Sequence, residues 1–311
     1  MNKPMRVFDL LVILGATAGG KTALAVETAR RLGAEIISAD SRQVYRGMDL
    51  GTGKDLAEYG EVPYHLIDIA DPGSEYSVFS FQRDCFAAIE DIRSRGRLPL
   101  ICGGTGMYMD AVLRGYRLVE VPENQQLRAE LGELDEDQLR CRLLELKPQQ
   151  HNRTDLDDRM RLIRAIEIAA GEQTAAEQLP PLPAIRPLVF GLRWPRDILR
   201  RRIALRLQQR IEAGMIQEVQ ALHNGGVSWQ ALEFYGLEYR LIAQHLQGQL
   251  NRNDMVQKLC SAIGQFAKRQ ETFFRRMERQ GICIHWLDGR ENPCDDLCKV
   301  LREWTLAEAG S

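Results

Sequence analysis

An eight-residue segment near the start of the chain has the residue types and the spacing of a phosphate-binding loop. Residues 15–22 are Gly-Ala-Thr-Ala-Gly-Gly-Lys-Thr, a full match to the pattern G-x-x-x-x-G-K-S/T. Such a loop surrounds an anion, a role expected here of Gly15, Ala16, Thr17, Ala18, Gly19, Gly20, Lys21 and Thr22. The Lys21 ammonium would neutralise phosphate oxygens, and the Thr22 hydroxyl would bind Mg²⁺. The sequence therefore predicts a protein that handles a di- or triphosphate.

The segments on either side of this loop are the ones that phosphate binding needs. Apolar residues from Val7 to Leu14 predict a buried strand that leads into the loop, and Lys21–Leu32 has the pattern of a helix. In this order the positive end of the helix dipole faces the anion. An ordinary glycine-rich turn, the alternative interpretation, would need neither flank.

The rest of the chain alternates between apolar runs and amphipathic stretches, as parallel strands joined by helical crossovers do. Further strands are predicted at 35–38, 98–102, 187–192 and 282–287, and helices at 78–95, 197–223, 236–246 and 254–280. Residues 117–183 are charged, poor in strand-like sequence and closed by prolines, which predicts a helical insertion domain. The expected fold is α/β: a P-loop NTPase-like parallel sheet flanked by helices, formed by residues 1–116 and 184–311.

A carboxylate after the second predicted strand is the candidate for the other half of a site. The carboxyl ends of neighbouring parallel strands share one crevice, so Asp40 and Thr105 should lie beside the phosphate loop. Many kinases and switches hold their metal with an acid at the end of a buried strand, but the strand at 98–102 ends in Gly-Gly-Thr-Gly. Asp40 could accept a proton from an incoming nucleophile. The alternative role for Asp40 is a helix cap or a contact with metal-bound water.

Composition excludes several classes of protein. The 311 residues are 44% hydrophobic, enough for a substantial core, and a formal net charge of −2 argues against a uniformly basic nucleic-acid binder. No apolar run reaches the roughly 18 residues of a membrane helix, so we expect a cytoplasmic protein without a membrane span. Seven cysteines without a disulfide framework fit reduced thiols, and Cys85, Cys102 and Cys141 are expected in the core.

Basic residues are concentrated in two stretches. The arginine-rich segment 193–210 has seven arginines against one acid, Asp197, and residues 268–279 hold a second basic group. Either stretch alone could be a solvated helix face. Together, in a chain with a phosphate loop, they favour a surface that binds a polyanion.

Besides the phosphate loop, six short motifs occur in order along nearly the whole chain: Asp40–Asp49, Gly51–Lys54, His65–Asp68, Gly103–Tyr108, Asp157–Glu167 and Ala267–Thr272. With this set the chain resembles the tRNA dimethylallyltransferase family, also called the tRNA isopentenyltransferases. The resemblance implies transfer of a dimethylallyl group from dimethylallyl diphosphate to the exocyclic amine of the adenosine 3′ of the tRNA anticodon. Diphosphate would be released.

The resemblance also implies roles for individual residues. Asp40 is similar to the family's general base, and Lys21 and Thr22 are similar to catalytic residues that hold the diphosphate, with Mg²⁺ as cofactor. Contacts with the tRNA are implied for Asp40, Ser41, Arg42, Gln43, Thr105, Met160, Arg161, Leu162, Ile163, Arg164, Lys268, Arg269 and Gln270. The implied partners are dimethylallyl diphosphate and the tRNA anticodon stem-loop, gripped by the insertion, and the enzyme is expected to be a monomer.

Some positions depart from the family's pattern. Proline and serine are usual where this loop has Ala16 and Gly19, and a Thr-Arg pair is common where Ile263-Gly264 stands. An arginine that assists catalysis in some members is replaced by Glu233. The arginine on the diphosphate side is therefore unassigned, and its candidates lie in the arginine-rich segment.

Two other functions stay open. An adenylate isopentenyltransferase, which prenylates AMP, ADP or ATP, would use the same fold. The insertion, the two basic stretches and the motif at 157–167 favour tRNA, because a small acceptor needs none of them. The alternative from another class is a P-loop kinase or an NTP-dependent nucleic-acid-binding protein, and the missing acid after the strand at 98–102 counts against it.

Overall fold

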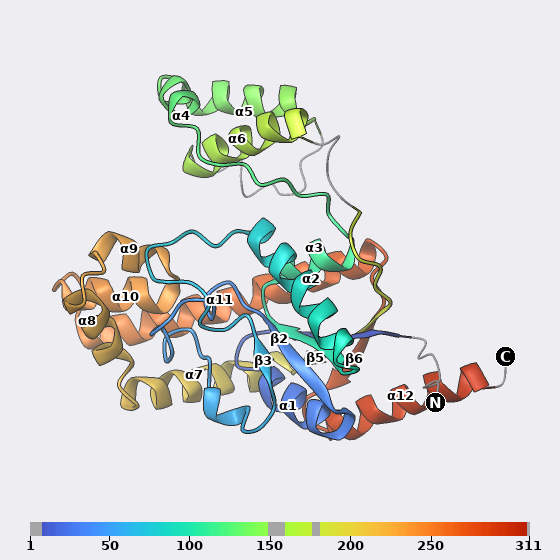
Figure 1. Ribbon diagram of the computed structural model, residues 1–311. Coiled ribbons are helices and arrows are strands. Elements are labelled where there is room, and N and C mark those ends of the chain that lie inside the picture. Colours follow the sequence, from blue (N-terminus) through green and yellow to red (C-terminus); the bar gives the residue numbers. More distant parts are fainter. Residues whose placement is uncertain (1–7, 149–158, 176–180, 310–311) are drawn as a thin grey trace. The chain divides into compact units, whose positions relative to one another are not determined.

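The computed structural model describes residues 8–148, 159–175 and 181–309 (Figure 1). The chain divides into two compact units, one formed by Met1–Arg114 with Ala184–Ser311 and the other by Gly115–Pro183. Within the described part of the chain, no helix combines the length and the apolar character that crossing a bilayer requires.

The first unit is built on a six-stranded parallel sheet with the strand order β3-β2-β4-β1-β5-β6. Its strands are β1 (Leu10–Gly15), β2 (Ala34–Ala39), β3 (Tyr64–His65), β4 (Leu98–Gly103), β5 (Pro187–Arg193) and β6 (Ile284–Asp288). Strands β1, β2 and β4 are buried along their whole length, which explains why their sequences are mainly apolar. The predicted α/β class with a parallel sheet is confirmed.

Helices cover both faces of this sheet. The first unit contains α1 (Lys21–Leu32), the 3-10 turn η1 (Leu56–Glu58), α2 (Val78–Ser94), α3 (Gly106–Leu113), α7 (Arg196–Glu212), α8 (Met215–Asn224), α9 (Trp229–Phe234), α10 (Leu237–Leu246), α11 (Arg252–Arg279) and α12 (Pro293–Ala309). Helices α1 and α12 pack together on one face, and α2, α3 and α11 lie on the other (Figure 1).

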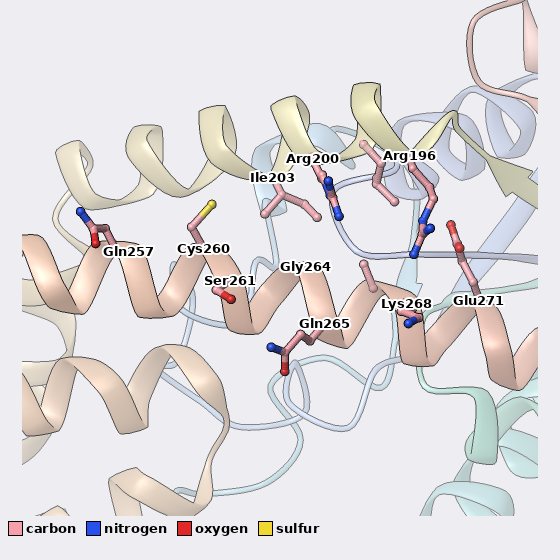
Figure 2. Close-up of a pocket in the computed structure, with 12 residues that line it drawn as sticks. Arg196, Arg200, Ile203, Gln257, Cys260, Ser261, Gly264, Gln265, Lys268 and Glu271 are labelled. Carbon is pink, nitrogen blue, oxygen red and sulfur yellow. The ribbon is translucent and has the colours of Figure 1, made fainter.

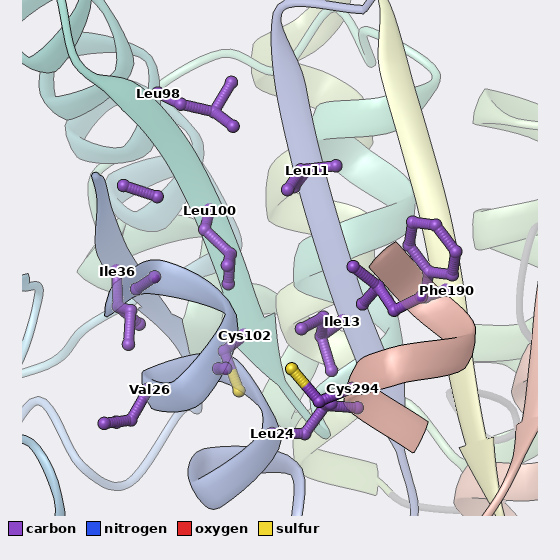
Figure 3. Packing of buried hydrophobic residues seen from close by; sticks show 14 of the residues in the cluster. Leu11, Ile13, Leu24, Val26, Ile36, Leu98, Leu100, Cys102, Phe190 and Cys294 are labelled. Atoms are coloured by element: carbon purple, nitrogen blue, oxygen red, sulfur yellow. The ribbon is translucent and has the colours of Figure 1, made fainter. Parts of the chain in front are cut away.

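A hydrophobic core lies between the sheet and the pair α1 and α12 (Figure 3). Leu11, Leu100 and Phe190 come from three neighbouring strands and are completely buried. Leu24 of α1 and Cys294 of α12 pack against them. Each large apolar side chain buried in this way contributes about 1.5–3 kcal/mol. This layer packs β1, β4 and β5 together, and the loops at their carboxyl ends follow from these packed strands.

The second unit contains the helices α4 (Gln125–Gly132), α5 (Glu136–Leu146) and α6 (Arg159–Ala175). A core of its own, which includes Leu131, Leu139, Leu143 and Ile166, joins the three helices. Asp135 begins α5 with a capping box that satisfies backbone N–H groups of the first turn. The helices predicted for this segment are therefore stabilised by a hydrophobic core and a helix cap that lie within the segment itself.

Three local features differ from the sequence prediction. The helix predicted at 197–223 is two helices, because Gly214 adopts a left-handed conformation with φ of 104° between α7 and α8. Strand β3 and helices α3, α9 and α12 were not predicted. Cys85 and Cys102 are buried as expected, but Cys141 is exposed, so its assignment to the core was wrong.

Candidate active site

Three segments of the chain meet where β1, β4 and β2 end. Leu14 in β1 and Ala39 in β2 both pair with Gly103 of β4, the strand between them. The phosphate loop follows β1 and Asp40 follows β2, so both begin at the level of Gly103 along the sheet. The ends of β1 and β2 that lead into them are two strand spacings apart, which is about 10 Å. The crevice expected from a parallel sheet thus has a phosphate loop on one side and a carboxylate on the other.

The backbone of the phosphate loop is oriented by side chains from the region of α7. The Ala18 carbonyl accepts a hydrogen bond of 2.9 Å from Arg202 Nε, and the Gly19 carbonyl accepts one of 2.8 Å from Trp194 Nε1. The guanidinium of Arg202 lies 4.2 Å from the centre of the Trp194 ring. In a trans peptide the N–H and the C=O point in opposite directions, so the N–H of Gly20 points away from Trp194. Trp194 had no motif signal in the sequence.

Lys21 is the first residue of α1, and its Nζ donates a hydrogen bond of 2.9 Å to the Ala16 carbonyl. Burial lowers the pKa of Lys21 from 10.5 to about 8; the charge of Arg206 also lowers it, whereas Asp40 raises it. A bound anion would favour the charged ammonium. Thr22 follows on the same first turn, where backbone N–H groups have no acceptor inside the helix. The loop, Lys21 and Thr22 are therefore arranged to receive phosphate oxygens.

Gln270 of α11 joins this loop to the end of β4. Its Oε1 accepts a hydrogen bond of 2.8 Å from the Thr17 N–H, and its Nε2 donates one of 2.8 Å to the Gly104 carbonyl. A Cβ atom at Gly104 would lie 2.3 Å from Nε2, so a larger residue there would displace the Gln270 amide. Gln270 is 7% exposed, whereas Lys268 and Arg269 are exposed. The amide of Gln270 is thus buried and bonded within the protein, and its expected contact with tRNA stays a prediction.

The loop after β2 is held by its own hydrogen bonds. Asp40 Oδ1 accepts from the Arg42 N–H at 2.9 Å, and Thr105 Oγ1 accepts from the Ser41 N–H at 3.1 Å. Asp40, Ser41, Arg42 and Thr105 are each partly exposed, so they remain accessible to a substrate. Gln43 is different: it is buried, and its amide bonds within the protein. Its expected contact with tRNA stays a prediction.

The second unit contains the other group of expected tRNA contacts. Met160 and Arg161 are exposed on α6, but Leu162 and Ile163 belong to the hydrophobic core of this unit, because they face α4 and α5. Their side chains are buried and support the helix, and their expected contact with tRNA stays a prediction. Arg164 donates to the Val121 carbonyl at 2.9 Å. Asp157 and Asp158, the start of the motif, lie outside the described residues.

Helix α7 turns three of its arginines toward the phosphate loop. Arg202, Arg206 and Arg210 are four residues apart and so share one helix face. Asp55 binds both Arg206 and Arg210, the latter at 3.3 Å. A small cavity between these two arginines and the loop is also lined by Glu238, whose pKa is raised by burial. No sequence motif pointed to Glu238, because the residues that surround it in the fold belong to segments far away along the chain.

A second cavity of about 710 Å³ lies between α7 and α11 (Figure 2). Arg196 and Arg200 of α7 and Lys268 of α11 place three positive charges around it, with Glu271 as the acidic residue of its lining. Ile203 lines both this cavity and the smaller one at the phosphate loop. The two basic stretches of the sequence therefore meet around one cavity of the first unit.

The parallel sheet, the phosphate loop at its carboxyl edge and the carboxylate across the crevice define a P-loop transferase. Comparison with protein families agrees: the model of the IPP transferase family matches residues 43–277, and that of the isopentenyl transferase family matches residues 8–61. The chain belongs to the IPP transferase family and is a prenyltransferase.

Individual relatives are similar along nearly their whole length. The chain is 66% identical over 292 residues to tRNA dimethylallyltransferase 2 of Syntrophotalea carbinolica, covering 94% of this chain and 98% of the relative. It is 61% identical to tRNA dimethylallyltransferase 2 of Trichlorobacter lovleyi, covering 96% and 98%. The crystal structure of the tRNA isopentenylpyrophosphate transferase of Bacillus halodurans superposes with a TM-score of 0.69 at 32% identity, covering 97% of this chain and 99% of that one.

Proposed function

We propose that this chain transfers a dimethylallyl group from dimethylallyl diphosphate to the exocyclic amine of the adenosine 3′ of the anticodon in tRNA, releasing diphosphate. The observation that carries the proposal is the strand register that sets the phosphate loop and Asp40 on opposite sides of Gly103. Support comes from relatives named tRNA dimethylallyltransferase at 66% and 61% identity. Such a reaction needs an anion site for the leaving group and a base for the amine.

The two halves of the site divide the chemistry between them. As the carbon–oxygen bond breaks, its electron pair leaves with the diphosphate, whose growing charge is stabilised by the loop N–H groups and by Lys21. Asp40 accepts a hydrogen bond from the adenine amine, directs it at the allylic carbon, and takes its proton as the new nitrogen–carbon bond forms. Thr105 sits between the two groups along the crevice. The acceptor adenosine leaves the base stack to reach Asp40, which is least costly in a loop.

We assign the unplaced arginine on the diphosphate side to Arg206. It lines the small cavity that reaches the phosphate loop, and its charge lowers the pKa of Lys21. Asp55 forms ion pairs with both Arg206 and Arg210. If Arg206 contacts the diphosphate, the Asp55 carboxylate therefore stays paired with Arg210. Arg202 is less suited, because its Nε is bonded to a loop carbonyl.

Thr22 is the residue that would hold Mg²⁺. Among the residues described, no group of three or more His, Cys, Asp or Glu side chains could hold a metal ion. Mg²⁺ on a diphosphate does not need one, because it takes one or two protein ligands together with phosphate oxygens and water. The hydroxyl beside Lys21 fits that demand. When bound, the ion would add positive charge at the diphosphate oxygens.

The tRNA would be held by two exposed groups, Met160 with Arg161 on the helical insertion 117–183, and Lys268 with Arg269 on α11. Contacts with the phosphate backbone set the register, while Asp40, Ser41, Arg42 and Thr105 act on the acceptor nucleotide. We place the reaction in the cytoplasm, where tRNA is processed, and propose a monomer as the active form.

The direct test is to incubate the protein with labelled dimethylallyl diphosphate and either an unmodified tRNA or AMP. Label in the tRNA is expected. Label in AMP alone would reject the proposal in favour of an adenylate isopentenyltransferase. Turnover of ATP without label transfer would favour a P-loop kinase or an NTP-dependent switch.

A further inference from the structure

A phenylalanine is held in solvent next to the loop that carries Asp40. Phe234, the last residue of α9, is 67% exposed. The residue after it is an anchor: Tyr235 is 3% exposed, its ring lies 4.7 Å from the ring of Tyr45, and its hydroxyl accepts a hydrogen bond from the Gly73 N–H. Because Tyr235 is fixed inward, Phe234 cannot be buried by a small rotation of the helix end.

An arginine of the site covers part of this ring. The guanidinium of Arg42 lies 5.4 Å from the centre of the Phe234 ring. The backbone N–H of the same arginine bonds to Asp40 at 2.9 Å. The Phe234–Arg42 pair is therefore tied to the carboxylate that would receive the acceptor amine, and most of the ring stays open to solvent.

We propose that Phe234 and Arg42 form a stacking platform for a nucleobase adjacent to the acceptor adenosine, an inference that rests on the proposed function. Unpaired bases of RNA loops are recognised by stacking on aromatic rings and on arginine planes. When the acceptor leaves the stack, its neighbour loses a stacking partner, and an aromatic surface beside Asp40 replaces it. The platform would hold the loop open while the amine lies at Asp40.

A protein partner fits this surface less well. One ring and one guanidinium expose far less than the roughly 800 Å² that each side of a stable protein interface buries. Their place beside Asp40 would also make such a partner compete with the substrate. The dimensions and the chemistry of the pair suit a single base.

Binding of a synthetic RNA stem-loop tests the platform. The full chain is titrated with stem-loops that carry the acceptor adenosine and a fluorescent 2-aminopurine on one or the other side of it. We expect quenching of one of the two probes by the wild type. Phe234→Ala should lose that quenching and weaken binding by about 5- to 100-fold, the usual effect of removing one stacked ring. Phe234→Trp should retain both, and Leu205→Ala, which removes a 58% exposed side chain on α7, should change neither.

Every other outcome would reject either the stacking platform or the proposed function. Unchanged affinity and quenching in Phe234→Ala would overturn the platform, as would equal weakening by the alanine and tryptophan variants. A wild-type dimer in gel filtration that Phe234→Ala converts to a monomer would assign the ring to self-association instead. Label transfer to the stem-loop by the wild type is measured in parallel. Its absence would reject the proposed function, whereas its presence with an unaffected Phe234→Ala variant would reject the platform alone.

Discussion

Gln270 Oε1 lies 2.8 Å from the backbone nitrogen of Thr17, whose N–H it accepts. The Nε2 of the same side chain donates to Gly104 at 2.8 Å. The next residue, Thr105, accepts the Ser41 N–H. One uncharged, buried side chain of α11 therefore connects the phosphate loop to the segments that surround Asp40.

Replacing Gln270 by alanine should loosen the phosphate loop. The change leaves the Thr17 N–H and the Gly104 carbonyl without their partner, at a cost of about 1–3 kcal/mol for each buried group. We expect a lower free energy of unfolding and roughly tenfold weaker binding of inorganic diphosphate, measured by calorimetry. Gln265→Ala, an exposed glutamine on the same helix, is the control. Equal diphosphate affinity in both variants would show that the loop keeps its shape without this link.

Replacing Asp40 by asparagine should remove the base and keep the loop. The amide oxygen still accepts the Arg42 N–H but cannot take the proton of the amine. Prenyl transfer should fall by about 10²- to 10⁴-fold, while RNA binding stays within a few fold. Single-turnover label transfer and filter binding measure the two effects. Asp71→Asn, on the nearby surface, serves as the control, and transfer at the wild-type rate by Asp40→Asn would contradict the role of Asp40.

Replacing Arg206 by glutamine tests the arginine on the diphosphate side. Loss of one charged hydrogen bond costs about 1.5–3 kcal/mol, so the KM for dimethylallyl diphosphate should rise by about 10- to 100-fold. Arg201→Gln, on the same helix but 79% exposed, should have no effect. If the two variants have the same KM, another group must meet the diphosphate.

Replacing Lys268 and Arg269 together by alanine should weaken tRNA binding and reduce its dependence on salt. Each phosphate contact contributes about 0.7–0.9 to the slope of log affinity against log salt. The slope of the double variant should therefore be smaller by about 1 to 2. Titrations at several salt concentrations give this slope, with Arg279→Ala as the control at the end of α11. A slope equal to that of the wild type would show that these charges face elsewhere.

Acid should remove a stabilising contribution from Glu35 at the start of β2. Burial alone would raise the pKa of Glu35, but hydrogen bonds from Arg95 at 2.7 Å and His65 at 2.9 Å bring it below 4.5. A lowered folded-state pKa stabilises the protein above pH 4.5, and this contribution is lost as the pH falls through the folded-state value. Urea unfolding of the wild type and Glu35→Gln should differ at pH 7 and converge in acid. A difference that persists unchanged at pH 3 would contradict this.

Local sequence predicts most of the fold because the signals are short in range. Apolar runs mark β1, β4 and β5, shorter and mainly apolar segments mark β2 and β6, and helical periodicity marks α1, α2, α10 and α11. Strand β3 has two residues, too few for any pattern. The end of α7 was not predicted, because the amphipathic pattern of the sequence continues through Gly214, whereas its backbone adopts a left-handed conformation that ends the helix.

The sequence by itself determined the phosphate loop, the strand and helix around it, and the carboxylate after β2. Each of these features is recognised from a pattern of only about ten consecutive residues. Tertiary structure decided which residues surround them. Gln270 follows Lys268 and Arg269 in the chain, yet the turn of α11 buries it against Thr17, and the same helical geometry buries Leu162 and Ile163. Burial depends on which face of a helix meets its neighbour, and that choice is made by segments far apart in the chain.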